Sequence, residues 1–357
     1  MSLTLRISGG LAVLFYMAAS GASTTVFAEP AGEADEPFSS IFSGEVSVEV
    51  QHDSTYDADD SDAELESTFA TIEAGLTAQF TRSFSIRSTL VFEPVLDPED
   101  DVFFEDHGLY AEELFAQYDA DWGALKGGKF NPAFAIGWDA APGIYGVDFA
   151  EDYELTEQIG GGIEIPLALG ESEHVLSAAV FFADTTALSD SVIQDRGQLD
   201  EEDGGAGNTE SLENFTVALD GDIAGTGYSL GFRRLAAGDG DPEDEIGASA
   251  ALTRAFAVGD GELELLGEGV WLSNAGGGED DALYGVFGVA YTIGDWTGSA
   301  VYTLRDIENV DTDQLATATI EYDIGHGFGL GLGYKFAEEE GLDSHTVGAL
   351  ATYSLEF

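Results

Sequence analysis

Residues of two kinds alternate one by one along the C-terminal segment of this chain, up to its last residue. Between 344 and 357, apolar residues such as Val347 and Tyr353 hold one set of alternate positions, and residues such as Thr346 hold the other. Successive side chains of a β-strand point to opposite faces, so a period of two predicts a strand with one apolar face. The same period dominates the chain from about residue 42 onward. We therefore expect an all-β fold.

The connections between the predicted strands alternate between short and long. We count sixteen candidate strands, and the connections after even-numbered strands are tight, as at Thr81-Arg82 and Gly294-Asp295. Most connections after odd-numbered strands are longer; they are 53–64, 94–108, 132–154, 185–210, 237–244, 275–280, 307–312 and 339–343. An even number of antiparallel strands with short turns at one end and long loops at the other is typical of transmembrane outer-membrane β-barrels. A soluble β-sandwich has no reason to separate its loops by length in this way.

Acidic residues are concentrated in the long connections. The chain has 69 Asp and Glu against 11 Lys and Arg, a formal net charge of −58. Runs such as Asp200-Glu201-Glu202-Asp203 fall between candidate strands, while the apolar faces of the strands keep a band without acids. A lipid-facing surface requires such a band, because a charge near the bilayer centre is costly. Nucleic acid is excluded as a partner, since binding phosphate needs a basic face. Solvation in saline surroundings is an alternative explanation for part of the charge.

The N-terminus has the order of a secretory signal peptide. Residues 1–28 contain Arg6, then an apolar stretch, and then Val26-Phe27-Ala28 with small residues at the cleavage positions. We expect cleavage after Ala28, a short periplasmic segment at 29–41 and a barrel over 42–357. Cleavage removes Arg6 and no acidic residue, so ten basic residues remain. The absence of cysteine is compatible with export.

The last five residues resemble the assembly signal of outer-membrane barrels. That signal ends in Phe after apolar or aromatic residues at alternate positions, and Tyr353, Leu355 and Phe357 match it. The resemblance implies recognition by the barrel-assembly machinery and an outer-membrane localisation.

The order of strands and loops after residue 42 resembles that of the sixteen-stranded porins, and Gly128-Lys129-Phe130-Asn131-Pro132 is similar to segments of anion-selective and siderophore-uptake porins. The resemblance implies outer-membrane lipid and lipopolysaccharide as partners, with a homotrimer as one candidate assembly. In porins the long third loop folds inward and narrows the channel, which points to 132–154 as a constriction loop. Its candidate constriction residues are Trp138, Asp139, Tyr145, Asp148, Glu151 and Asp152.

The alternation also assigns charged residues to the inside of the barrel, opposite the apolar positions of their strands. The predicted pore-lining acids are Glu45, Glu49, Glu73 and Glu113, and the predicted pore-lining bases are Arg87, Arg233, Arg305 and Lys335. Any polar residue on a barrel strand must face water, so solvation alone is one interpretation. The other is a basic wall opposite an acidic third loop, because rings of charge give pores their ion selectivity. Arg254 breaks the alternation, and Lys126 and Lys129 fall on opposite faces; a bulge or a boundary position would explain either.

Two other kinds of site are possible in principle, a calcium site in the acidic loops and a catalytic site at the histidines. Asp57 with Asp59, and Asp239 with Asp241, space their oxygens as Ca²⁺ prefers, but neither segment matches a full twelve-residue calcium loop. Solvated loops are therefore the preferred interpretation, and no cofactor is expected. The five histidines form no persuasive catalytic dyad, and no Gly-x-Ser-x-Gly or zinc spacing occurs, so we do not expect an enzyme.

A barrel of sixteen strands is too wide to be filled by side chains and holds an aqueous channel. We therefore expect passive diffusion of small hydrophilic solutes or ions, with a preference for cations. One alternative is a ligand-specific uptake channel or binder, for example for a metal chelate or siderophore. Another is a structural barrel that bridges lipopolysaccharide through divalent cations.

Overall fold

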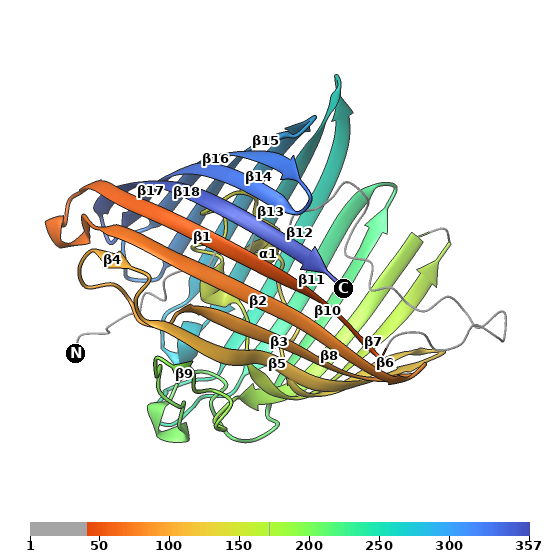
Figure 1. Ribbon diagram of the computed structural model, residues 1–357. Coiled ribbons are helices and arrows are strands. Elements are labelled where there is room, and N and C mark those ends of the chain that lie inside the picture. The colour runs from red at the N-terminus through yellow and green to blue at the C-terminus, as the bar shows by residue number, and fades with distance from the viewer. Residues whose placement is uncertain (1–40, 171) are drawn as a thin grey trace.

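One antiparallel sheet closes on itself to form a barrel (Figure 1). The computed structural model describes residues 41–170 and 172–357, so the predicted signal peptide and nearly all of segment 29–41 lie outside the described residues. The sixteen wall strands in this part of the chain are β1 (Phe42–Ala58), β2 (Glu66–Thr81), β3 (Phe84–Pro94), β5 (His107–Ala120), β6 (Gly123–Phe130), β7 (Gln158–Leu169), β8 (Ser172–Ala183), β10 (Asn214–Ile223), β11 (Thr226–Leu235), β12 (Glu245–Val258), β13 (Gly261–Ser273), β14 (Ala282–Ile293), β15 (Trp296–Ile307), β16 (Asp313–Gly325), β17 (Phe328–Glu339) and β18 (Leu342–Glu356). The barrel closes where β1 pairs with β18, with Val48 opposite Tyr353. The predicted fold class and strand number are confirmed.

Short helices and strands occur in the loops. They are β4 (Val102–Phe103), β9 (Val192–Ile193), α1 (Gly137–Ala140), η1 (Ser61–Ala63), η2 (Glu151–Tyr153), η3 (Glu201–Asp203) and η4 (Ala275–Gly277). Within the described residues, no helix is long and apolar enough to cross a membrane.

The last of the predicted long connections is wrong. β17 and β18 continue to pair until Glu339 lies opposite Leu342, so only Glu340 and Gly341 form the turn. Both turn residues have positive φ, 53° and 77°. Two consecutive residues with positive φ give a turn whose twist matches the strands, which is why the acidic run at this point continues as strand instead of opening into a loop.

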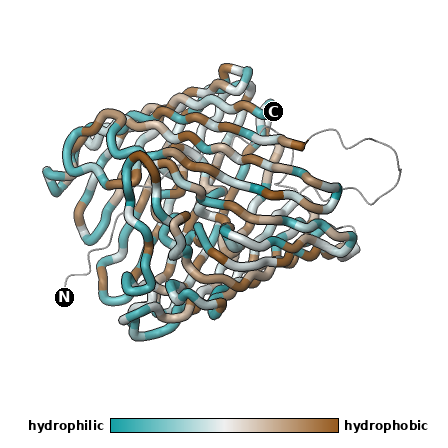
Figure 2. The backbone as a smooth tube through the Cα atoms, turned by 60° about the horizontal axis from the view of Figure 1, so that its bottom comes forward, coloured by the Kyte–Doolittle hydropathy of each residue, from teal (hydrophilic) through white to brown (hydrophobic). Residues whose placement is uncertain are grey.

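The alternation in the sequence becomes an outer apolar face and an inner polar face. Figure 2 shows hydropathy changing from residue to residue along the strands. On β17, Leu330 and Leu332 are 50% and 61% exposed on the outside. On β1, Glu49 and Gln51 point inward, and they are buried although they are polar.

β6 pairs with only part of β5, and a loop from later in the chain covers the rest of that strand edge. β6 has only eight residues, and it pairs with β5 from Leu114 onward. The chain then turns into the barrel, so β6 leaves the first part of β5 without a neighbour on this side. The loop between β8 and β10 covers this edge, where β9 pairs Ile193 with Gly108 of β5. An uncovered strand edge would leave backbone groups without hydrogen bonds, so this loop belongs to the wall.

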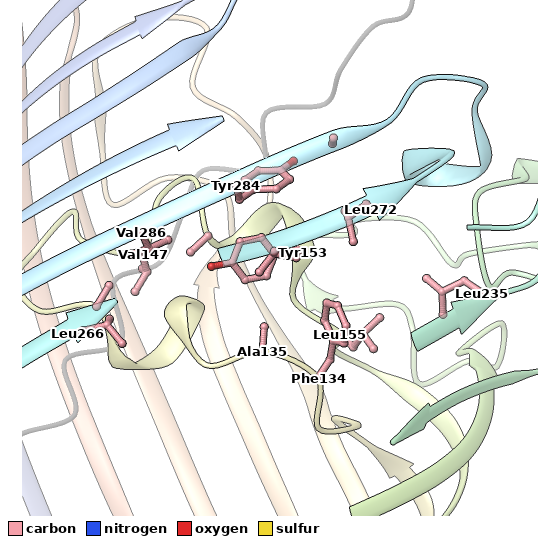
Figure 3. Packing of buried hydrophobic residues seen from close by; sticks show 14 of the residues in the cluster. Phe134, Ala135, Val147, Tyr153, Leu155, Leu235, Leu266, Leu272, Tyr284 and Val286 are labelled. Carbon is pink, nitrogen blue, oxygen red and sulfur yellow. The ribbon is translucent and has the colours of Figure 1, made fainter. Parts of the chain in front are cut away.

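The largest apolar core lies between the loop that follows β6 and the inner face of the wall (Figure 3). Phe134, Tyr153 and Leu155 of the loop pack with Leu266 and Tyr284 of the wall. The Tyr153 and Tyr284 rings meet edge to face, with centroids 5.1 Å apart. The loop is thus packed like a protein interior and is not a free strand of chain in the lumen.

Candidate functional site

The segment between β6 and β7, residues 131–157, folds into the barrel and is called the crossing loop below. It contains α1 and η2, and the predicted constriction loop 132–154 lies within it. Its polar contacts reach every wall strand from β11 to β17 and also β1, and Asn131 at its start contacts β5. A passage beside the crossing loop would therefore lie toward β2 and β3, which none of these contacts reaches.

A carboxylate on β13 holds two distant parts of the crossing loop. Glu268 Oε2 accepts a hydrogen bond of 2.8 Å from the Ile136 amide, and Oε1 accepts one of 2.8 Å from the Gly137 amide. Oε1 also accepts the Tyr153 hydroxyl at 2.7 Å. Glu268 is only 6% exposed, so these bonds form in a dry environment.

Arg233 anchors the end of the crossing loop. Its Nε donates to Glu245 Oε1 at 2.7 Å, and its Nη1 donates to the Tyr153 carbonyl oxygen at 2.6 Å. The guanidinium also lies over the Phe134 ring, 4.5 Å from its centroid. Because the side chain is only 3% exposed, it does not face a water-filled passage.

Two more of the predicted pore-lining bases bind carboxylates of the crossing loop. Arg305 forms an ion pair of 2.9 Å with Asp152, and its Nη2 lies 2.8 Å from an oxygen of Asp313 and of Glu339. Lys335 forms an ion pair of 2.9 Å with Asp148. The two cations also lie over aromatic rings of the loop, Arg305 over Phe149 at 4.3 Å and Lys335 over Tyr145 at 4.9 Å.

These contacts correct the predicted role of Arg233 and Arg305. Both side chains are buried loop anchors rather than charges exposed on the pore wall. The physical reason is that a cation on the inner face finds the carboxylates and carbonyls of an inward loop before it finds water. Arg87, on β3, differs from them: within the described residues it forms no ion pair, and its Nε has no hydrogen-bond partner.

The acids predicted to line the pore lie on the first strands of the wall. Cross-strand pairing puts Glu45 and Glu49 of β1, Glu73 of β2 and Glu113 of β5 on the same inner face. The like-charge neighbours of Glu73 are Glu113, Glu45 and Asp139 of α1. Glu113 has a second role, since its Oε1 accepts the Asn131 amide at 3.1 Å and so fastens the start of the crossing loop. Glu49 is almost fully buried.

The remaining predicted constriction residues have separate roles. Trp138 is half-buried against the apolar core and donates from Nε1 to the Ala135 carbonyl at 2.9 Å. Tyr145 donates its hydroxyl to Asp53 Oδ1 of β1 at 2.5 Å, which pins the middle of the loop near the barrel seam. Burial, with the neighbouring carboxylates Asp148 and Glu154, raises the pKa of Glu151 well above its ordinary value.

Glu154 of the crossing loop was not singled out from the sequence. Burial, with repulsion from the negative charges of Glu112 and Asp139, raises its pKa to about 8. A carboxyl group that titrates there changes the charge of the loop within the physiological pH range.

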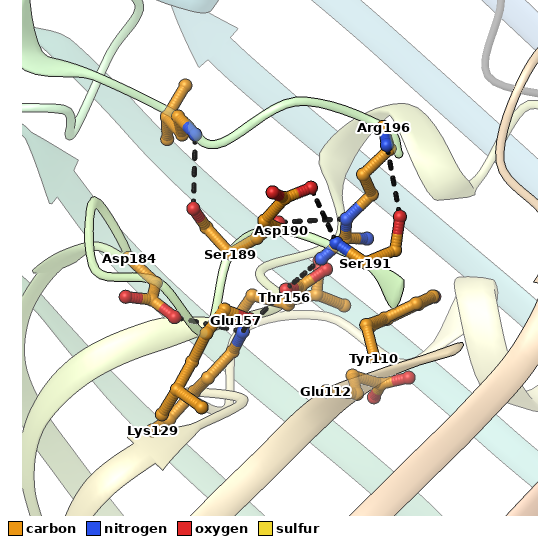
Figure 4. Close-up of polar contacts among 12 residues, drawn as sticks. Tyr110, Glu112, Lys129, Thr156, Glu157, Asp184, Ser189, Asp190, Ser191 and Arg196 are labelled. Atoms are coloured by element: carbon orange, nitrogen blue, oxygen red, sulfur yellow. Dashed lines mark hydrogen bonds and ion pairs between the residues drawn. The ribbon is translucent and has the colours of Figure 1, made fainter. Parts of the chain in front are cut away.

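A buried ion cluster holds the point where the crossing loop rejoins the wall (Figure 4). Lys129 Nζ lies 2.6 Å from Glu157 Oε2 and 2.9 Å from Asp184 Oδ2, and its side chain has no exposed surface. Arg196 binds the same Glu157 oxygen at 2.6 Å and lies over the Tyr110 ring.

This cluster explains why Lys126 and Lys129 lie on opposite faces of β6. Lys126 points inward and pairs with Glu164 at 3.2 Å, whereas Lys129 points outward and is covered by the β8–β10 loop. Arg254 faces outward near the short-turn end, where its Nη1 donates to Thr226 Oγ1 at 2.7 Å.

Two of the four calcium candidates accept hydrogen bonds from backbone amides. Asp59 Oδ2 accepts the Asp343 amide at 3.2 Å, and Asp241 Oδ2 accepts the Gly238 amide at 3.0 Å. Asp57 lies near the end of β1, opposite His345, and Asp239 lies in the same loop as Asp241. In the part of the chain that the structure describes, no group of three or more acidic or histidine side chains is arranged to hold a metal ion.

The predicted assembly signal forms the end of β18. Leu355 and Phe357 are 49% and 60% exposed on the outer face, and Tyr353 packs on Phe328, with ring centroids 4.5 Å apart. The Phe357 backbone exchanges two hydrogen bonds of 3.0 Å with Gly44, so the last residue is part of the seam.

No family model matches the sequence, and no curated protein sequence does so either. Solved structures are similar to it in fold. The outer-membrane channel DcaP of Acinetobacter baumannii matches with a TM-score of 0.59 at 12% identity, over 88% of this chain and 96% of that one. OprB of Pseudomonas putida matches with a TM-score of 0.63 at 8% identity, over 88% and 94% of the two chains. An anion-selective porin from Comamonas acidovorans matches with a TM-score of 0.55 at 12% identity, over 88% and 98%. The chain therefore has the fold of the outer-membrane porins, with a closed barrel of sixteen strands.

Proposed function

We propose that this protein is an outer-membrane channel for the passive diffusion of small hydrophilic solutes or ions, with a preference for cations. The fold supports a water-filled barrel that the crossing loop narrows, since the structural neighbours are outer-membrane channels and porins. One observation carries the cation preference. Arg233, Arg305 and Lys335 are bound to the crossing loop or to wall carboxylates, so the acids around Glu73 face the passage with few cations to oppose them.

The anion-selective porin among the structural neighbours is a useful contrast, because a shared fold does not determine the sign of the selectivity. Selectivity depends on which charged side chains remain free in the narrow part of the pore. In this chain five basic residues are bound at the crossing loop or at its exit, namely Lys129, Arg196, Arg233, Arg305 and Lys335.

Recordings in planar lipid bilayers on the pure protein test the proposal. In a gradient of potassium chloride, the reversal potential should have the sign of cation preference, and the preference should weaken as total salt rises. Anion preference at low and high salt would refute it. Saturable block by one solute would instead identify a ligand-specific uptake channel. A folded barrel that carries no current would instead support the structural role.

We also propose that the barrel self-associates, with a homotrimer as the expected state. Apolar side chains are exposed on the loop strands, beyond the apolar rows of the wall: Phe103 is 70%, Val192 62% and Ile193 79% exposed. Such residues are unfavourable in water and are typical of an interface with another protein or with lipid. Chemical cross-linking of the protein in native membranes should give a trimer. A monomer there would assign these residues to contacts with lipopolysaccharide.

Assembly is proposed to depend on the last residue. Deletion of Phe357 removes both the apolar terminal side chain and two hydrogen bonds of the seam. We expect less folded barrel in the outer membrane and more degradation in the periplasm, measured by heat-modifiable migration in detergent gels. No enzymatic activity is proposed.

A further inference from the structure

We propose that Glu268 is the positioning residue for selectivity: it holds α1, and with it the exposed carboxylate of Asp139, in place inside the barrel. This inference rests on the proposed function. It assigns the control of the passage to a buried wall residue that does not itself line the pore.

The geometry around Glu268 is that of a clamp. Three donors converge on its carboxylate: the amides of Ile136 and Gly137 and the hydroxyl of Tyr153. The two amides begin α1, and Tyr153 ends η2, so one side chain joins both sides of the crossing loop. Gly137 is held so closely that a β-carbon there would collide with Glu268 Oε1 and with the Tyr153 hydroxyl.

α1 depends on this clamp because it cannot maintain itself. It has four residues and no side-chain cap at its N-terminus. A single helical turn is unstable in isolation, since few hydrogen bonds offset the loss of backbone freedom. The Glu268 carboxylate also satisfies two backbone amides that would otherwise be buried without a partner, which would be costly.

The clamp acts on the passage through two neighbouring residues of α1. Trp138 turns towards the apolar core, whereas Asp139 is exposed in the lumen. Asp139 is among the like-charge neighbours of Glu73 on β2. If α1 moved, the wall acids would stay in place, but the charge facing them would be lost.

Only a carboxylate fits the three donors. An ionised carboxylate offers acceptors on both oxygens, whereas the amide of glutamine offers one acceptor oxygen and one donor group. Glu268→Gln therefore keeps the size of the side chain but points N–H groups at another N–H or at a hydroxyl.

Glu264 provides the matched control. It lies four residues earlier on β13, so it points to the same inner face, and no hydrogen bond among the described residues links it to the crossing loop. Glu264→Gln and Glu268→Gln remove the same charge from the same strand. A difference between them reports on positioning and not on the charge of the lumen.

The experiment uses two measurements on each full-length protein. The first is single-channel recording in a potassium chloride gradient. The second is quenching of Trp138 fluorescence by acrylamide, with Trp122, Trp271 and Trp296 replaced by Phe so that Trp138 is the only tryptophan left. We expect Glu268→Gln to show fluctuating current levels, weaker cation preference and stronger quenching, while Glu264→Gln behaves like the parent in current stability and quenching. Tyr153→Phe, which keeps the charge but removes one of the three bonds, should show a smaller change in the same direction.

The outcomes separate this inference from the proposed function. If Glu268→Gln and Glu264→Gln give the same currents and the same quenching, Glu268 is not a positioning residue. If the parent protein carries no current but Glu268→Gln still exposes Trp138, the channel function fails and the clamp is supported. If Glu268→Gln does not fold, as judged by heat-modifiable migration, Tyr153→Phe decides: unchanged quenching and current would overturn the inference.

Discussion

Arg305 on β15 and Asp152 in the crossing loop, 153 positions apart in the chain, are joined by a hydrogen bond of 2.9 Å. The same guanidinium contacts Asp313 and Glu339, so one cation is shared by three carboxylates. The contact makes the position of an inward loop depend on a residue of the opposite wall.

Replacing this cation should destabilise the barrel rather than tune its selectivity alone. Arg305→Gln leaves three carboxylates together, and removing one partner of a buried ion pair costs about 3–5 kcal/mol. We expect a lower unfolding temperature and noisier current. Arg87→Gln is the control, because within the described residues Arg87 forms no ion pair. It should strengthen cation preference with little change in stability, and equal effects of the two variants would contradict their separate roles.

Neutralising the acids of the passage should weaken cation preference. Glu73→Gln combined with Asp139→Asn removes two acids whose charges repel each other, and the reversal potential should shift toward zero. Glu201→Gln, in the β8–β10 loop, removes a charge from an exposed position instead. Exposed charges act over a Debye length of about 8 Å at physiological salt, so this control should have little effect. A larger shift from the control would move the selective region to the loops.

The crossing loop should make the channel sensitive to pH. Burial raises the pKa of Glu154 to about 8, so this carboxyl is mostly neutral below that pH and charged above it. We expect cation preference to increase between pH 6 and pH 9. Because the pKa is raised in the folded state, the same titration should lower stability as pH rises from the ordinary glutamate range, about 4.3, through about 8. Glu154→Gln should flatten both dependences, and a selectivity profile unchanged by it would exclude Glu154 as their source.

The ion cluster at the exit of the crossing loop should seal the wall above β6. Lys129→Met leaves Glu157 and Asp184 without their shared cation. We expect a loss of about 3–5 kcal/mol in the free energy of unfolding and faster proteolysis within 184–213. Lys126→Met is the control, since its ion pair with Glu164 is partly exposed to the lumen. Similar proteolysis of both variants would show that the cluster does not hold the loop.

The mature protein should begin at Glu29. The order of charged, apolar and small residues in 1–28 predicts cleavage after Ala28. The intact mass of protein extracted from the outer membrane measures this directly. A mass that includes residues 1–28 would remove the argument for export.

The strands of the wall are predicted well from the sequence, because the alternation of polar and apolar residues within each strand shows which side chains face the lumen and which face lipid. A period of two, read within a dozen residues, is enough to place Glu73 of β2 and Glu113 of β5 on one face. The closed barrel of sixteen strands follows from the same local pattern and from the spacing of the turns.

The contacts of the crossing loop could not be predicted in this way. Glu268 and Gly137 are 131 positions apart, and the alternation around each residue does not predict a contact with the other. The same holds for Lys129 and its partners: Asn131-Pro132 marks the end of β6, but nothing near it indicates that the β8–β10 loop covers Lys129. Local periodicity gives the direction of a side chain, but a partner across the lumen depends on how the whole barrel closes.

The pairing of the β8–β10 loop with β5 has a consequence for the order of folding. Hairpins added in chain order would complete β5, β6 and β7 while the upper edge of β5 was still bare, because the residues that cover it come only after β8. Contacts between distant parts of a chain form late, since the intervening segment must first be ordered. The early hairpins should therefore pass through a stage in which this edge of β5 is unpaired, and the stage should end when β9 pairs with β5.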